Sequence, residues 1–142
     1  AYCKKLVDNP DGERLLYTDD VSVFMHCTNI NGESVLTNFD GFTALDFVIP
    51  LSISEMCWPT PFDEPFSINV SNDMRIPLGL RWVLQMMRVG ERWMVYVPYY
   101  DNVGYGENDT SFQFSDGNGY STSAMVLGCS VLAYDIIVDG LI

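Results

Sequence analysis

The sequence predicts an α+β domain with one short amphipathic helix and five or six strands. Three observations support this fold class. Apolar and polar residues alternate over residues 20–30 and 91–98, and β-branched residues dominate residues 131–138. Only residues 80–87 have the 3.6-residue apolar spacing of a substantial helix. We therefore expect the 142 residues to form one domain built mainly from strands.

The first strong element is a strand over residues 20–30. A turn at residues 9–12 and a short strand at residues 15–17 are expected before it. Both faces of residues 20–30 carry apolar groups, which is typical of a central strand. The following Asn31-Gly32 dipeptide predicts a two-residue hairpin that brings residues 33–37 back antiparallel.

The middle of the chain combines an insertion, a strand and the helix. Prolines interrupt the apolar pieces of residues 38–64, so we expect a long insertion with some strand content near residues 45–51. Strand character resumes at residues 65–70. The helix is indicated by the i, i+3, i+4, i+7 spacing of four residues and by a glycine able to end it: Leu80, Val83, Leu84, Met87 and Gly90.

The last third predicts two strands separated by a long loop. Trp93, Val95 and Val97 share one face of a strand over residues 91–98. Residues 99–123 are rich in Asn, Asp, Gly, Ser and Tyr, so we expect no regular element there. Residues 131–138 then form the closing strand.

Composition excludes several classes of partner. Seven Lys and Arg stand against 19 Asp and Glu, which gives a net charge of −12 that would repel nucleic acid and acidic membranes. No apolar stretch approaches the length of a membrane-spanning helix. With 48% hydrophobic and 13% aromatic residues, the chain has enough apolar side chains for a folded core.

No metal or cofactor site is predicted. The four cysteines (Cys3, Cys27, Cys57 and Cys129) lack the close spacing of a zinc clip, and buried free thiols are favoured over a disulfide. Acidic residues of the 99–123 region could bind calcium, but they lack the spacing of a calcium loop. The single histidine, His26, lies on an apolar strand and is expected to have a structural, hydrogen-bonded role.

The chain starts Ala1-Tyr2-Cys3 without a methionine or a leader, which we interpret as a processed or trimmed sequence. Few lysines and many Tyr, Asn, Asp and Gly residues favour a protein of the bacterial cell envelope or a secreted protein. The sequence gives no indication of the oligomeric state.

Several motifs, taken in order, resemble the FKBP-type peptidyl-prolyl cis-trans isomerases. The similar segments are residues 20–37, 65–107 and 126–138, about half of the chain. They contain Met25-His26-Cys27-Thr28, Pro65-Phe66-Ser67-Ile68, Gly104-Tyr105-Gly106-Glu107 and Ser130-Val131-Leu132-Ala133-Tyr134-Asp135-Ile136. The resemblance implies a single FKBP-like domain over residues 1–142, with an insertion at about 38–64 and a long flap loop at about 99–125.

The family fold implied is a twisted antiparallel sheet of five to six strands wrapped around one short helix. The implied activity is rotation about Xaa-Pro bonds of polypeptides, and the implied partners are proline-containing polypeptides. Amide resonance gives this rotation a barrier of about 20 kcal/mol, and water favours the charge-separated planar form. A dry apolar pocket that grips the prolyl ring and bonds the carbonyl in the twisted geometry therefore lowers the barrier without nucleophile or cofactor.

The resemblance also implies the site residues. Tyr105 stands where the family has the flap tyrosine whose hydroxyl bonds the substrate carbonyl, and we expect it to be catalytic. The expected substrate-binding residues match pocket or rim positions: Val35, Phe66, Ile76, Leu80, Val126 and Tyr134.

Other positions depart from the family pattern. Cys27 replaces a tyrosine, Val35-Leu36 replaces a Phe-Asp pair, Ile68 replaces a phenylalanine, and Leu80 replaces the tryptophan of the pocket base. Two functions follow as hypotheses. One is a working isomerase, and the other is a catalytically weak or inactive FKBP-like module that binds polypeptides as a chaperone or scaffold. An unrelated function is a third reading.

Overall fold

The protein is described here from a computed structural model. It describes residues 2–16, 18–39, 41–42, 58–73, 75–100, 103–115 and 121–142. The strands are β1 (Tyr2–Val7), β2 (Asp20–Asn29), β3 (Ser34–Thr37), β4 (Phe66–Asn69), β5 (Arg92–Val97), β6 (Thr110–Ser115), β7 (Ser121–Val126) and β8 (Leu132–Leu141), and the helix is α1 (Leu78–Leu84).

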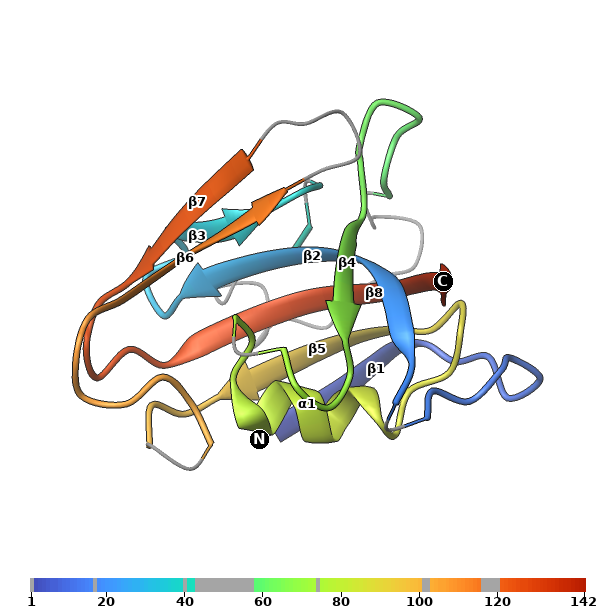
Figure 1. The fold of residues 1–142 in the computed structure, drawn as a ribbon, viewed down its shortest axis with the longest axis horizontal. Helices are drawn as coiled ribbons and strands as arrows, with labels where there is room; N and C mark the ends of the chain where they lie inside the picture. The colour runs from blue at the N-terminus through green and yellow to red at the C-terminus, as the bar shows by residue number, and fades with distance from the viewer. Residues whose placement is uncertain are drawn as a thin grey trace.

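A six-stranded antiparallel sheet organises the molecule (Figure 1). Its order is β1-β5-β8-β2-β3, and β4 also pairs with β2. The long strand β2 accommodates two partners on one edge because its first residues pair with β4 and its last residues pair with β3. Strands β6 and β7 form a separate antiparallel hairpin that contacts β3. The predicted fold class, an antiparallel α+β sheet with one short helix, is confirmed.

The sheet buries side chains on both faces. On the face that carries α1, which we call the front face, strand residues such as Val23, Val95 and Tyr134 join the main core with Leu80 of the helix. On the opposite back face, Phe24 packs with Phe39 and other residues in smaller clusters. Burial on both sides explains why residues 20–30 carry apolar groups at successive positions, and the central placement expected for this strand is confirmed.

His26 has the structural role that its position predicts. Its Nδ1 lies 2.8 Å from the Thr37 hydroxyl oxygen across the β2–β3 pair. In the part of the chain that is described, no helix is long and apolar enough to cross a membrane.

The expectation of an irregular loop over residues 99–123 is wrong in part. Strand β6 lies within this range, and strand β7 begins within it and continues past its end. Phe112 and Phe114 alternate with polar residues in β6, but the surrounding glycine-rich composition hides this short period. The N-terminal strand β1 lies before the first predicted strand. It is an edge strand paired only with β5, where lysines are common.

Turns account for the remaining differences. The helix ends at Leu84, before Gly90, which instead has a positive φ of 90° in the turn that leads into β5. Three residues rather than two lie between the residues that close the β2–β3 hairpin, since the Asn29 N–H bonds the Glu33 carbonyl, and Gly32 within this loop has φ of 81°. Leu15 and Leu16 belong to no strand, and the apolar piece at 45–51 lies outside the described residues.

The cysteines only partly fit the expectation of buried thiols. Cys27, Cys3 and Cys129 are free, but only Cys27 is buried, whereas Cys3 is half-buried and Cys129 is exposed. Cys129 lies in a turn and has a positive φ of 61°.

Candidate functional site

The centre of the front face is formed by Tyr134 and its two neighbours in register. Tyr134 of β8 lies opposite Val95 of β5 on one side and Cys27 of β2 on the other. All three side chains are buried, and Tyr134 is only 1% exposed. Because side chains of a strand alternate between faces, the flanking Ala133 and Asp135 point to the back face. Tyr134 therefore forms the floor of the region between sheet and helix.

The helix and β4 supply the walls of this region. Phe66 comes from β4, Ile76 from the turn before the helix, and Leu80 from the buried side of α1. They belong to the same core cluster as Tyr134, and Leu80 is 0% exposed. The apolar spacing of the helix thus places Leu80, Val83 and Leu84 against the sheet, as expected.

Tyr105 is placed by glycines on both sides. Gly106 has a positive φ of 88°, and its N–H bonds the Tyr99 carbonyl at 2.7 Å. A Cβ on Gly104 would lie 2.0 Å from the Pro98 carbonyl oxygen, so only glycine allows that approach. The segment that precedes Tyr105 in the sequence is bound to the helix, because the Gly79 N–H donates to the Val103 carbonyl at 2.7 Å.

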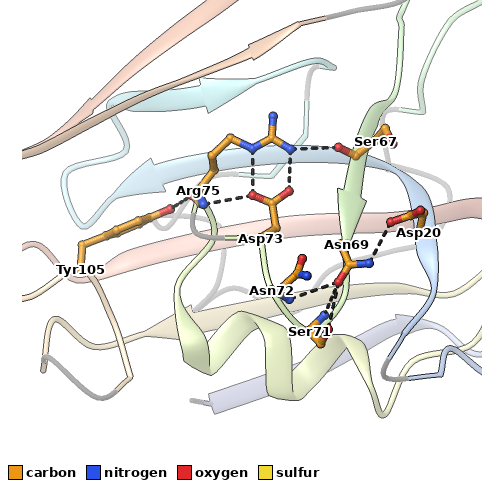
Figure 2. A network of polar contacts seen from close by, with 8 residues as sticks. All are labelled: Asp20, Ser67, Asn69, Ser71, Asn72, Asp73, Arg75 and Tyr105. Carbon is orange, nitrogen blue, oxygen red and sulfur yellow. Dashed lines mark hydrogen bonds and ion pairs between the residues drawn. The ribbon is translucent and has the colours of Figure 1, made fainter.

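The Tyr105 ring and hydroxyl both have partners. The ring stacks on Phe112 of β6 with centroids 5.5 Å apart and an interplanar angle of 20°. The hydroxyl donates to the backbone carbonyl of Arg75 (Figure 2). Figure 2 also shows that Arg75 is held by the carboxylate of Asp73, with Nε to Oδ1 at 2.8 Å. The Tyr105 hydroxyl is therefore engaged by the chain itself.

Burial keeps the polar groups of this region neutral. Burial is the largest cause that raises the pKa of Tyr105, and it also raises the pKa of Tyr134 well above 10. The pKa of the Cys27 thiol rises from 9.0 to about 12, again mainly through burial. At neutral pH these groups can donate hydrogen bonds, but none of them can act as a base or as a thiolate nucleophile. The chemistry available is hydrogen bonding within an apolar environment.

All seven residues expected at the site belong to the main core or pack against it. We call this set the front cluster, and it consists of Val35, Phe66, Ile76, Leu80, Tyr105, Val126 and Tyr134. Val35 and Tyr105 are half-buried at the margin of this core, and the other five are buried within it. Leu36 and Cys27, at the positions that depart from the family pattern, are buried beside them in the same core.

A separate cavity lies on the back face. Its volume is about 430 Å³, and its lining includes Phe24 of β2, Ile137 of β8 and residues 58–61. No residue of the front cluster lines it.

The sequence reasoning missed Asp73, Arg75 and Phe112. Asp73 and Arg75 lie between the strand expected at residues 65–70 and the expected helix, in a stretch to which no role was assigned. Phe112 falls in the segment where no element was expected. Its contact with Tyr105 depends on the hairpin, so sequence spacing alone gave no signal.

Comparison with solved structures agrees with the geometry. The chain is similar to the three FKBP domains of wheat FKBP73, with a TM-score of 0.64 and 17% identity over 99% of this chain and 45% of that chain. It is also similar to FkpA from Escherichia coli, with a TM-score of 0.58 and 17% identity over 98% of this chain and 46% of that chain. No family model and no curated protein matches.

The fold is therefore FKBP-like, as the sequence resemblance implied. This chain spans less than half the length of either structural neighbour.

Proposed function

We propose that this domain binds Xaa-Pro segments of polypeptides at the front cluster and catalyses their cis-trans isomerisation. The observation that supports the proposal is that six residues from separate parts of the chain, together with Tyr105, belong to one apolar core or pack against it. The FKBP-like fold supports it. The prolyl ring contacts Phe66, Leu80 and Tyr134, and the Tyr105 hydroxyl donates to the substrate carbonyl.

The chemistry follows from the surroundings of Tyr105. An apolar cluster removes water from the substrate amide, which disfavours the planar, charge-separated form. The Tyr105 phenol is protonated throughout the neutral range, and burial raises its pKa further, so it serves as a hydrogen-bond donor there. A hydrogen bond that is better aligned in the twisted geometry than in the planar one lowers the barrier.

Substrate entry requires displacement of protein contacts. Leu80 and Tyr134 are almost fully covered, so a prolyl ring reaches them only after neighbouring side chains move. The segment at 103–105 is the part that moves in this proposal, because it reaches the helix through the Gly79 N–H and reaches Arg75 through the Tyr105 hydroxyl. Both bonds are re-formed after product leaves.

A second candidate is an FKBP-like module that binds polypeptides without efficient catalysis. Leu36 is buried in the core where the family pattern has a carboxylate, and the Tyr105 hydroxyl already has an acceptor in Arg75. Neither feature prevents a polypeptide from binding through apolar contacts alone.

NMR exchange spectroscopy on a short peptide with an apolar residue before proline tests both candidates. The uncatalysed exchange takes about 10–100 s at 25 °C, so acceleration by the protein is measured directly. We expect acceleration, and we expect Tyr105→Phe to reduce it about tenfold, the effect of one hydrogen bond made in the transition state. Tyr100→Phe, at an exposed tyrosine of the same segment, is the matched control and leaves the rate unchanged.

The other results assign the function differently. Peptide binding by folded protein with the spontaneous exchange rate supports the second candidate and contradicts catalysis. Absence of both binding and acceleration contradicts both candidates.

A further inference from the structure

The Tyr105 hydroxyl has one proton to donate, and the Arg75 carbonyl accepts it. A substrate carbonyl can take this hydrogen bond only by replacing Arg75. The Arg75 carbonyl is therefore one of the contacts that set where the hydroxyl rests before substrate arrives, together with the stacking of the ring on Phe112. A group that fixes Arg75 thus contributes to the orientation of Tyr105.

The carboxylate of Asp73 holds Arg75 through its backbone N–H and through its side chain. Its Oδ1 accepts the Arg75 backbone N–H at 3.0 Å and the Arg75 Nε at 2.8 Å, and its Oδ2 accepts the terminal guanidinium nitrogen at 2.5 Å. This paired, charge-assisted geometry is the strong form of an arginine–carboxylate contact. Backbone and side chain of Arg75 are thus fixed by one group.

Further contacts join this arrangement to the fold. The Arg75 guanidinium also donates to the Ser67 carbonyl of β4 at 3.2 Å, and the Ile76 N–H bonds the Asp73 carbonyl at 3.3 Å. The Asp73 carboxylate is itself sheltered, because the residue is 9% exposed. Pro77 follows Ile76 and favours an extended backbone there. The turn that presents the Arg75 carbonyl is therefore constrained on both sides.

We propose that Asp73 is a positioning residue, whose carboxylate fixes the Arg75 carbonyl and thereby holds the Tyr105 hydroxyl beside the front cluster. Its importance for catalysis rests on the proposed isomerase function. Asp73 touches no part of the substrate. Its effect on the reaction is transmitted through the Arg75 peptide to the donor.

Two measurements on Asp73→Asn test this proposal. In protein labelled at tyrosine Cζ, the Tyr105 resonance is assigned from the Tyr105→Phe variant and reports the hydroxyl environment without requiring activity. We expect Asp73→Asn to move this resonance, and to lower kcat for peptide isomerisation about tenfold with KM within about twofold, because binding depends mainly on apolar contacts. Asp20→Asn is the matched control. Asp20 accepts a hydrogen bond from the Asn69 side chain at the end of β4 (Figure 2), and its change moves neither readout.

Arg75→Lys provides a second route if Asp73→Asn does not fold. Lysine keeps the charge but lacks the planar fork, so the Tyr105 resonance moves in the same direction and kcat falls. An unmoved Tyr105 resonance in the folded variants overturns the positioning role. If wild-type protein fails to accelerate exchange, the isomerase proposal fails, and the resonance alone still decides whether Asp73 positions Tyr105.

Discussion

The buried pair of Arg92 and Asp135 is predicted to be a major determinant of stability. Both side chains are fully buried, with Nε to Oδ1 at 2.8 Å and a terminal nitrogen to Oδ2 at 2.6 Å. Asp135 Oδ2 also accepts the Phe42 N–H at 2.8 Å. The rings of Phe39, Phe42 and Trp58 lie 4.9–5.3 Å from the guanidinium carbon, so the charge is surrounded by aromatic groups.

Asp135→Asn removes one charge and leaves the other buried. Breaking a buried pair in this way costs about 3–5 kcal/mol, mostly as the penalty of an uncompensated charge. For a chain of 142 residues this corresponds to a fall in Tm of about 10–15 °C. Urea unfolding followed by tryptophan fluorescence measures the difference in free energy of unfolding.

Two further variants sharpen the test. Asp139→Asn changes an exposed aspartate of the same strand, hydrogen-bonded to Ser22 at 3.3 Å, and is expected to cost less than about 1 kcal/mol. The double change Arg92→Met with Asp135→Leu removes both charges, and we expect it to be less destabilising than Asp135→Asn alone. A loss below about 1 kcal/mol for Asp135→Asn would refute the argument that this charge is buried and dependent on its partner.

Three other predictions concern the front face. Gly79→Ala should lower the free energy of unfolding by about 1–2 kcal/mol, because the new Cβ would lie 2.8 Å from Val103 Cγ1. Helix propensity alone predicts the opposite, a more stable protein. A variant that is more stable than wild type in urea unfolding would therefore contradict the close packing at this position. Stability should fall by about 1.4 kcal/mol per pH unit as pH rises from 9 toward 12, because the unfolded Cys27 thiol loses its proton first. When the free energy of unfolding is measured at pH 8, 9 and 10, the Cys27→Ala variant should lack this dependence on pH. If the variant keeps the dependence of the wild-type protein, a group other than Cys27 causes it. Phe112→Leu removes the ring stacked on Tyr105 and should slow peptide exchange about threefold to tenfold; an unchanged rate would show that this stacking does not support the donor.

Periodicity was enough to predict the sheet and the helix. Alternation indicated residues 20–30 and 91–98 and β-branched content indicated residues 131–138, and these strands lie in one sheet, while the helix buries the residues that share its apolar face. The hairpin of β6 and β7 was missed because its alternation is short and polar. Arg92 and Asp135 were missed as partners because their pairing depends on the β5–β8 register, which no local pattern reveals.

The site residues remain a prediction, because what the fold shows of them is their place in the main core. Motif order selected the seven residues of the front cluster, and all of them belong to that core or pack against it. The engagement of Tyr105 by Arg75 could not be predicted, because it requires the 73–76 turn and the segment around Tyr105 to meet across 30 positions of sequence.

The most direct test of the central claim, that Xaa-Pro segments bind at the front cluster, is a methyl NMR titration of the protein with a proline-containing peptide. The front cluster offers Val35, Ile76, Leu80 and Val126 as methyl probes, and Ile137 reports the separate cavity on the back face. We predict saturable shifts of the front methyls with Ile137 unchanged. Shifts confined to Ile137, or no shifts at any of these methyls, would contradict the claim.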